Sequence, residues 1–294
     1  MKLLSELCQE IDEPAYKFGR PSLHLSDMIF GSALKVYTTF SLRRFMTDMR
    51  IASDKGHIGK ICSYSSISNY MRDESLTPIL MNLITLSAMP LRSVETKFAI
   101  DSSGFRTSKF TEYFKIKYNA VKEHHWVKAH ICTGVKTNII TAVEVDAEEG
   151  NFCPDSPQFI PLAKATYESG FTMSEVSADK AYLSRDNMDY ADSIGAIPYI
   201  PFKRNMVGKP KGHSHVWRKM FNYFVYNRDD FLAHYHARSN VESTFNMVKS
   251  KFDDLIRSKD KVSQKNEMLL KVLCHNIVIL IHEMNELGVE PNFV

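Results

Sequence analysis

The stretch of sequence that decides the fold is Tyr235-His-Ala-Arg238-Ser-Asn-Val-Glu242-Ser-Thr-Phe-Asn-Met-Val-Lys249. On a helix, with about 100° per residue, one stripe about 60° wide holds Tyr235, Arg238, Glu242 and Lys249. The neighbouring stripe is apolar and is the side that would face a protein core; it holds Val241, Phe245, Val248 and Phe252. The sequence therefore predicts a helix that packs on its apolar side and presents a guanidinium, a carboxylate and an ammonium along one edge.

The spacing of these four residues has two interpretations. An Arg–Glu pair four residues apart is common on surface helices and stabilises them by only about 0.2–0.5 kcal/mol. The pattern Tyr-x2-Arg-x3-Glu-x6-Lys, however, resembles the C-terminal catalytic motif of the DDE transposases of bacterial insertion sequences, which belong to the ribonuclease H-like superfamily. All four positions match here. The resemblance implies that two upstream aspartates complete the site.

Composition limits the class of protein. The chain has 294 residues, 44% of them hydrophobic, which is enough to bury a sizeable core, and its net charge is only +3. The five cysteines are widely spaced without a C-x-x-C pair, which argues against a disulfide framework or structural zinc site and favours a reducing compartment. Neither a signal peptide nor an apolar run that could span a bilayer is evident. We therefore expect a cytoplasmic protein with no membrane partner.

The region after residue 95 changes from helical to strand-like periodicity. Strands are expected at Phe98–Ile100, Trp126–Gly134, Asn138–Val145, Ser174–Ala178 and Ile197–Phe202. Helices are expected at Ser156–Ser169 and Arg185–Ile194, before the helix of the quoted stretch. This order predicts an α/β fold with a mixed five-stranded sheet flanked by helices. It resembles the ribonuclease H-like fold.

We expect three regions along the chain. Residues 1–95 read as mostly helical, with a basic cluster at Arg43, Arg44 and Arg50. They suit a helix-turn-helix-like DNA-binding region and, almost as well, an ordinary helical subdomain. Residues 96–262 form the expected ribonuclease H-like catalytic domain. Residues 263–294 are expected to form a C-terminal packing helix.

Two aspartates occupy the positions that the resemblance requires. Asp101 follows the first expected strand, where the Ser102–Gly104 segment is expected to turn the chain away, and Asp179 follows the fourth. An aspartate at a strand end is usually a turn cap, and Glu242 alone would be a surface charge. Together, in these positions, they favour a catalytic triad of Asp101, Asp179 and Glu242. Asp155 precedes a helix, where capping explains it.

The triad has the chemistry of a magnesium site. Mg²⁺ takes oxygen ligands, and two ions about 3.5–4 Å apart can activate a nucleophile and stabilise the leaving oxygen of a phosphodiester. The resemblance implies two Mg²⁺ ions, with Mn²⁺ as a substitute, held by the three carboxylates. It also implies cleavage of double-stranded DNA at terminal inverted repeats, strand transfer into target DNA, and a homodimer on paired ends.

Contacts to DNA are expected from two segments. A loop between Pro201 and Lys219 holds six Lys or Arg and no Asp or Glu, so it is either solvated or in contact with phosphate. With the residues that the resemblance assigns, the expected DNA-contacting set is Tyr235, Arg238, Lys249, Lys203, Arg204, Lys209 and Lys211. Two alternatives stay open: a ribonuclease H-like nuclease or resolvase without strand transfer, and a non-catalytic DNA-binding descendant.

Overall fold

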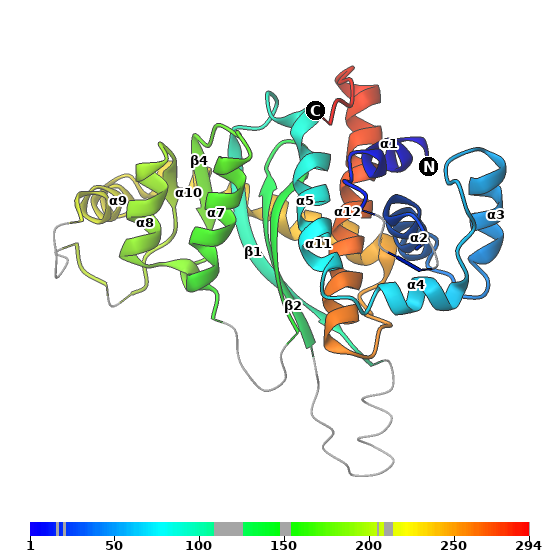
Figure 1. Cartoon of the computed structure of the whole chain (residues 1–294). Coiled ribbons are helices and arrows are strands. Elements are labelled where there is room, and N and C mark those ends of the chain that lie inside the picture. The colour runs from blue at the N-terminus through cyan, green and yellow to red at the C-terminus, as the bar shows by residue number, and fades with distance from the viewer. Residues whose placement is uncertain are drawn as a thin grey trace, which may run out of the picture.

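The computed structural model describes residues 1–15, 18–19, 22–108, 126–147, 154–204, 206–208 and 214–293. Its N-terminal part is helical, its middle part holds the sheet, and one long helix ends it (Figure 1). The N-terminal helices are α1 (Lys2–Gln9), α2 (Leu25–Thr38), α3 (Met46–Asp54), α4 (Tyr64–Tyr70), α5 (Leu76–Ala88) and the short η1 (Met89–Leu91). Among the helices of these ranges, none combines the length and the apolar character needed to cross a membrane.

The described residues contain a mixed sheet of five strands in the order β3-β2-β1-β4-β5. The strands are β1 (Lys97–Arg106), β2 (Trp126–Gly134), β3 (Ile140–Asp146), β4 (Glu175–Ala178) and β5 (Ile197–Tyr199). β2 runs antiparallel to both β1 and β3, whereas β4 is parallel to β1 and β5. This confirms the predicted α/β fold with N-terminal helices, and the strand order is consistent with a ribonuclease H-like fold.

Strand β1 is longer than its sequence suggests. The predicted turn at Ser102–Gly104 is wrong, because these residues pair in register with Lys128–His130 of β2. Pairing to a neighbouring strand outweighs the weak turn preference of serine and glycine. On its other side β1 pairs with β4 only as far as Ile100, opposite Ala178. The pairing of the two parallel strands therefore ends just before Asp101 on β1 and Asp179 after β4.

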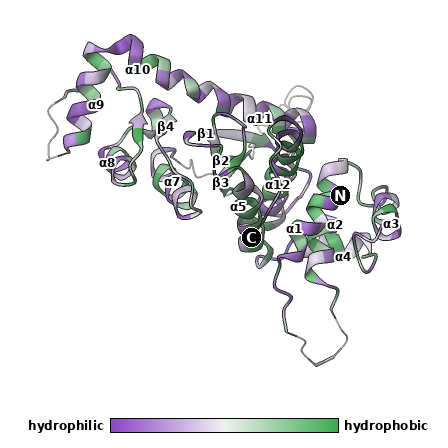
Figure 2. Ribbon diagram, turned by 90° about the horizontal axis from the view of Figure 1, so that it is seen from above, coloured by the Kyte–Doolittle hydropathy of each residue, from purple (hydrophilic) through white to green (hydrophobic). Residues whose placement is uncertain are grey.

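Helices cover both faces of the sheet. The helices between β3 and α12 are η2 (Ser156–Gln158), α7 (Phe159–Glu168), η3 (Lys180–Tyr182), α8 (Arg185–Ser193), α9 (His215–Tyr226), α10 (Arg228–Tyr235), η4 (His236–Arg238) and α11 (Ser239–Phe252). α10 and α11 follow one another across one face, and α7 and α8 lie on the opposite face (Figure 2). α9 takes up the end of the predicted basic loop, since its buried Val216, Trp217 and Met220 recur at helical spacing.

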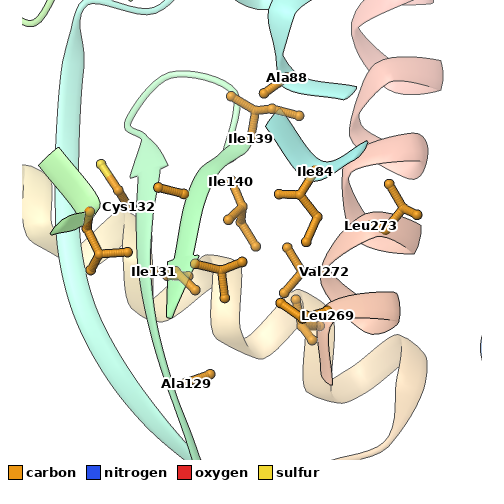
Figure 3. Close-up of a cluster of buried hydrophobic side chains, with 14 of the residues drawn as sticks. Ile84, Ala88, Ala129, Ile131, Cys132, Ile139, Ile140, Leu269, Val272 and Leu273 are labelled. Atoms are coloured by element: carbon orange, nitrogen blue, oxygen red, sulfur yellow. The ribbon is translucent and has the colours of Figure 1, made fainter. Parts of the chain in front are cut away.

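The long helix α12 (Lys261–Glu286) joins the N-terminal helices to the sheet. It packs against α2, α5 and β3, and its side chains meet those of β2, β3 and α5 (Figure 3). The labelled side chains are Ile84, Ala88, Ala129, Ile131, Cys132, Ile139, Ile140, Leu269, Val272 and Leu273. All of them are buried. The N-terminal helices, the sheet and α12 therefore share one hydrophobic core.

A buried histidine on α12 predicts a dependence of stability on pH. His275 donates a hydrogen bond from Nε2 to the carbonyl oxygen of Asn138, 2.9 Å away, and burial lowers its pKa to about 4. An unfolded histidine titrates near pH 6.5, as a rough reference value. Between these two values the unfolded chain binds a proton that the folded chain does not, so the free energy of unfolding falls as pH falls through this window. Below about pH 4, the titration of His275 alone lowers the free energy of unfolding by up to about 3 kcal/mol.

We expect His275→Gln, which cannot titrate, to flatten the pH dependence between about pH 6.5 and 4. Urea denaturation of both proteins at several pH values within this window measures the effect. His24→Gln is the matched control, because the His24 side chain is 74% exposed. Equal slopes of unfolding free energy against pH in His24→Gln and His275→Gln would show that His275 does not cause this pH dependence.

Candidate catalytic site

The first two acids of the site come from neighbouring strands. Asp101 lies within β1, one residue beyond its last pairing with β4, and accepts a hydrogen bond of 2.8 Å from the Ser102 amide. Asp179 directly follows β4 and caps η3, accepting from the Lys180 amide at 2.6 Å. Because paired strands lie about 4.8 Å apart, the end of the β1–β4 ladder brings these two aspartates together.

The third acid comes from the quoted stretch, which is helical but not one continuous α-helix. Tyr235 is the last residue of α10, the 3₁₀ turn η4 follows, and Glu242 lies in the first turn of α11. A 3₁₀ turn winds by about 120° per residue, so Tyr235 is rotated from its expected place on the stripe. Arg238, Glu242 and Lys249 keep their predicted order along the edge of the helix.

Arg238 connects the acids of the sheet to the acid of the helix. Its guanidinium donates one hydrogen bond to Asp101 Oδ2 and one to Glu242 Oε1, the second at 2.5 Å. Arg238 and Asp101 are mostly buried, whereas the Glu242 side chain is 56% exposed. The predicted Arg–Glu pair therefore exists, but its guanidinium also binds the strand aspartate, which a plain surface pair would not do.

Like charges crowd Asp101. Burial raises the pKa of this carboxyl, and the neighbouring Asp179 and Glu242 raise it further, against the opposing effects of the Ser102 amide and Arg238. All three acids are thus close enough to interact electrostatically. A partly buried group of carboxylates that repel one another is stabilised by added positive charge. This is the electrostatic signature of a functional site.

Lys249 and Tyr235 belong to the same stretch of sequence as Arg238 and Glu242. The Lys249 ammonium donates to Ser103 Oγ at 2.7 Å and lies 5.1 Å from the centre of the Phe105 ring, and burial lowers its pKa. Tyr235 faces the Arg238 guanidinium, 5.9 Å from its ring centre, and burial raises its pKa. The helix edge therefore presents Arg238 among the acids and Lys249 further along, at Ser103.

The basic loop contributes less to the described site. Lys203 and Arg204 are exposed and follow β5, and neither pairs with a described acid. Lys209 and Lys211 lie outside the described residues. The structure thus brings together Asp101, Asp179, Glu242, Arg238 and Tyr235, with Lys249 further along the same helix.

Asp155 belongs to a second polar cluster beside the site, which sequence reasoning missed. Helix capping does not explain it, because its side chain makes no cap hydrogen bond. Instead it accepts from Lys128 Nζ at 2.8 Å and from Ser102 Oγ at 2.9 Å, with His130 Nδ1 at 3.6 Å. Alternation along β2 places Lys128 and His130 on one face, a signal that could have indicated such a cluster. Asp155 thereby fixes the side chain of Ser102, the residue after Asp101.

The donor set fits a hard divalent cation. It consists of carboxylate oxygens, which Mg²⁺ and Mn²⁺ prefer, and their mutual repulsion would be relieved by a cation. In the present arrangement Asp101 and Glu242 bind Arg238, and among the described residues no three His, Cys, Asp or Glu side chains are arranged around a common metal position. Because the Glu242 side chain is largely exposed, it can rotate toward the aspartates without disturbing the core.

A family model identifies the family of this chain. The family model described as "Transposase DDE domain" matches residues 92–277, which include all three acids, Arg238 and Lys249. A fold comparison matches the cryo-EM structure of a piggyBac transposase synaptic complex with hairpin DNA, at 11% sequence identity and a TM-score of 0.43, over 99% of this chain and 73% of that chain. A comparison with curated protein sequences finds no match.

Proposed function

This chain belongs to the family of transposase DDE domains, and from that premise we propose that it cleaves DNA at the ends of a bacterial insertion sequence and joins the freed ends to target DNA. One observation carries the proposal: acids from β1, from the end of β4 and from α11 crowd around one arginine. These three acids come from separate elements of the fold. Their mutual repulsion does not favour folding, so their proximity indicates a functional site.

Asp101, Asp179 and Glu242 are the residues that would hold two Mg²⁺ ions, or Mn²⁺ in their place. Bound divalent ions supply charge neutralisation for a phosphodiester and activation of the attacking oxygen. Family members generally depend on divalent metals. The chain's own contribution is to fix two carboxylates where the ladder of the interior strands β1 and β4 ends, and the third on a helix that Arg238 links to Asp101.

The cations beside the acids are proposed to position DNA. A guanidinium has five N–H donors, so two hydrogen bonds to carboxylates leave Arg238 donors for a phosphate. Lys249 acts as a point charge on phosphate, and the Tyr235 ring packs beside the scissile end. Lys203 and Arg204, with Lys209 and Lys211, would follow the DNA backbone further away.

We propose that the three regions predicted from the sequence have different roles. Residues 1–95 would contact DNA, residues 96–262 would carry the chemistry, and residues 263–294 would form a packing helix. The DNA partner would be the double-stranded terminal inverted repeats and the target, bound by a homodimer on paired ends.

Metal-dependent cleavage and joining of a linear duplex that carries the element's ends tests the proposal. With Mg²⁺ we expect nicked and joined products from the wild-type chain, and with EDTA we expect neither. Separate quantification of nicked and joined DNA is essential. Nicking without joining would support a ribonuclease H-like nuclease or resolvase instead. DNA binding without any cleavage would indicate a non-catalytic descendant.

A further inference from the structure

A cavity of about 330 Å³ lies between the N-terminal helices and the loop that joins α11 to α12. Figure 1 shows α2 next to α12, and the two helices are in contact. Its lining includes four basic residues, Lys35, Arg72, Arg257 and Lys259, and one acid, Asp260. We call it the basic pocket. No part of the candidate catalytic site lines it.

Lys35 is the unusual residue of the basic pocket. It lies on α2 and is only 7% exposed, and its ammonium forms no hydrogen bond or ion pair with any residue that the structure describes. The nearby acid is Glu267, whose two oxygens already accept hydrogen bonds from the Arg257 and Ser258 amides, at 3.0 and 2.8 Å, and from the Ser258 hydroxyl. Burying a cation without a partner costs stability. Lys35 Nζ is not among the fully buried side-chain atoms without a partner in the described residues, so the ammonium faces the open space of the basic pocket.

The other charges of the pocket leave an excess of positive charge. Arg72 lies 3.3 Å from Asp260, which also accepts from the Ser263 amide at 2.9 Å, so the one acid of the lining is already engaged. The Arg257 guanidinium donates to the Thr39 carbonyl oxygen, and it lies 3.9 Å from the carboxylate of Asp253. Lys259 is exposed and forms no ion pair within the described part of the chain. The pocket therefore suits an anion.

We propose that the basic pocket binds a phosphate group, and that its source is the backbone of DNA that extends from the catalytic site. The identity of the DNA rests on the proposed function, whereas the affinity for phosphate does not. From Glu242 to the end of α11 at Phe252 the helix spans about 15 Å, and the basic pocket lies beyond that end, at Arg257. At about 3.4 Å per nucleotide of one strand, this length corresponds to a phosphate at least about four nucleotides from the cleaved bond.

The pocket also has a place for the rest of a nucleotide. The Phe40 ring lines it and is half exposed. An exposed aromatic ring beside a basic groove offers a face on which a sugar or base can pack. A lysine that costs stability but contacts a phosphate agrees with the general pattern that residues unfavourable to the fold mark binding sites.

Lys35→Met in the full chain tests the proposal, because methionine fills a similar volume without charge. Fluorescence anisotropy with a labelled duplex should show affinity lower by about tenfold, since a hydrogen bond to a charged group is lost. The slope of log affinity against log salt should fall in magnitude by about 0.9, the effect of one phosphate contact. Thermal stability should stay equal or rise. Lys164→Met on α7 removes the same charge from an exposed site and is the matched control.

A second arm uses inorganic phosphate and separates the pocket from the proposed function. At constant ionic strength, phosphate in place of chloride should raise the melting temperature of the wild type and of Lys164→Met by more than that of Lys35→Met, because only the first two add site binding to the general stabilisation that phosphate gives. Lys259→Gln, at an exposed position, should weaken both phosphate and DNA binding without a change in folding. If the wild type binds phosphate through Lys35 but binds no DNA, the ligand is a free phosphate compound and the proposed function fails instead. Equal DNA affinity, salt slope and phosphate response in Lys35→Met and Lys164→Met would overturn the proposal that the basic pocket binds phosphate.

Discussion

Replacing Glu242 with glutamine is expected to slow metal-dependent DNA cleavage on the order of a thousandfold, with folding and DNA binding retained. A metal ion contributes several kcal/mol to the stabilisation of a phosphoryl transition state, and about 1.4 kcal/mol corresponds to a tenfold change in rate. The amide has one oxygen and no charge, so it is a poor substitute for a carboxylate ligand. Because the Glu242 side chain is 56% exposed and its described partner is Arg238 alone, the substitution should leave the core unchanged.

Single-turnover cleavage rates at saturating DNA measure this effect, since they separate chemistry from binding. Glu168→Gln on α7 is a closely matched control, because Glu168 is 64% exposed and pairs with Lys164 four residues earlier, as Glu242 pairs with Arg238. The control should cleave at the wild-type rate. A Glu242→Gln protein within tenfold of the wild type would show that the carboxylate serves only as a surface partner of Arg238.

The parts of the fold that depend on local pattern could be predicted from the sequence. Strand alternation and the change of periodicity after residue 95 predicted the five-stranded mixed sheet, and Asp179 does follow β4. Asp101 is predicted to follow the first strand, but it lies within β1. The chain does not turn at Ser102–Gly104, because β2 pairs with these residues; it is the β4 pairing that ends there. Which neighbour a strand keeps is a tertiary property that one sequence does not reveal.

The contacts that hold the site together could not be predicted in the same way. The signature spacing indicated an Arg–Glu pair but not the bond from Arg238 to Asp101, which joins residues far apart in the chain. The 3₁₀ turn before α11 has no strong sequence signal. Asp155 looked like a helix cap, because the residue type suits that role, but Lys128 and Ser102 compete for its carboxylate. Long-range pairing of polar groups is decided by packing rather than by local propensity.

Glu95 is expected to be the most important buried acid for stability, and Glu95→Ala should lower the free energy of unfolding by about 3–5 kcal/mol. Glu95 is 1% exposed and precedes β1. Its Oε1 accepts from the Thr137 amide at 2.5 Å and from the Thr137 hydroxyl at 2.7 Å, and its Oε2 accepts from the Lys136 amide at 3.3 Å. Alanine would leave these donors in the turn between β2 and β3 without an acceptor, inside a region that water reaches poorly.

Urea denaturation measures the loss, with Glu10→Ala as the control at an exposed position where little change is expected. Gly134→Ala offers an independent test of the same contact, because a Cβ at this position would collide with the Glu95 side chain and force it away from the turn. That turn also accepts a hydrogen bond of 2.9 Å from Asn240 of α11 to the Val135 carbonyl oxygen. Both substitutions should therefore loosen the helix that carries Glu242 as well as lower stability. Glu95→Ala with wild-type stability would show that the turn donors find water instead, and that the anchoring of α11 does not depend on this carboxylate.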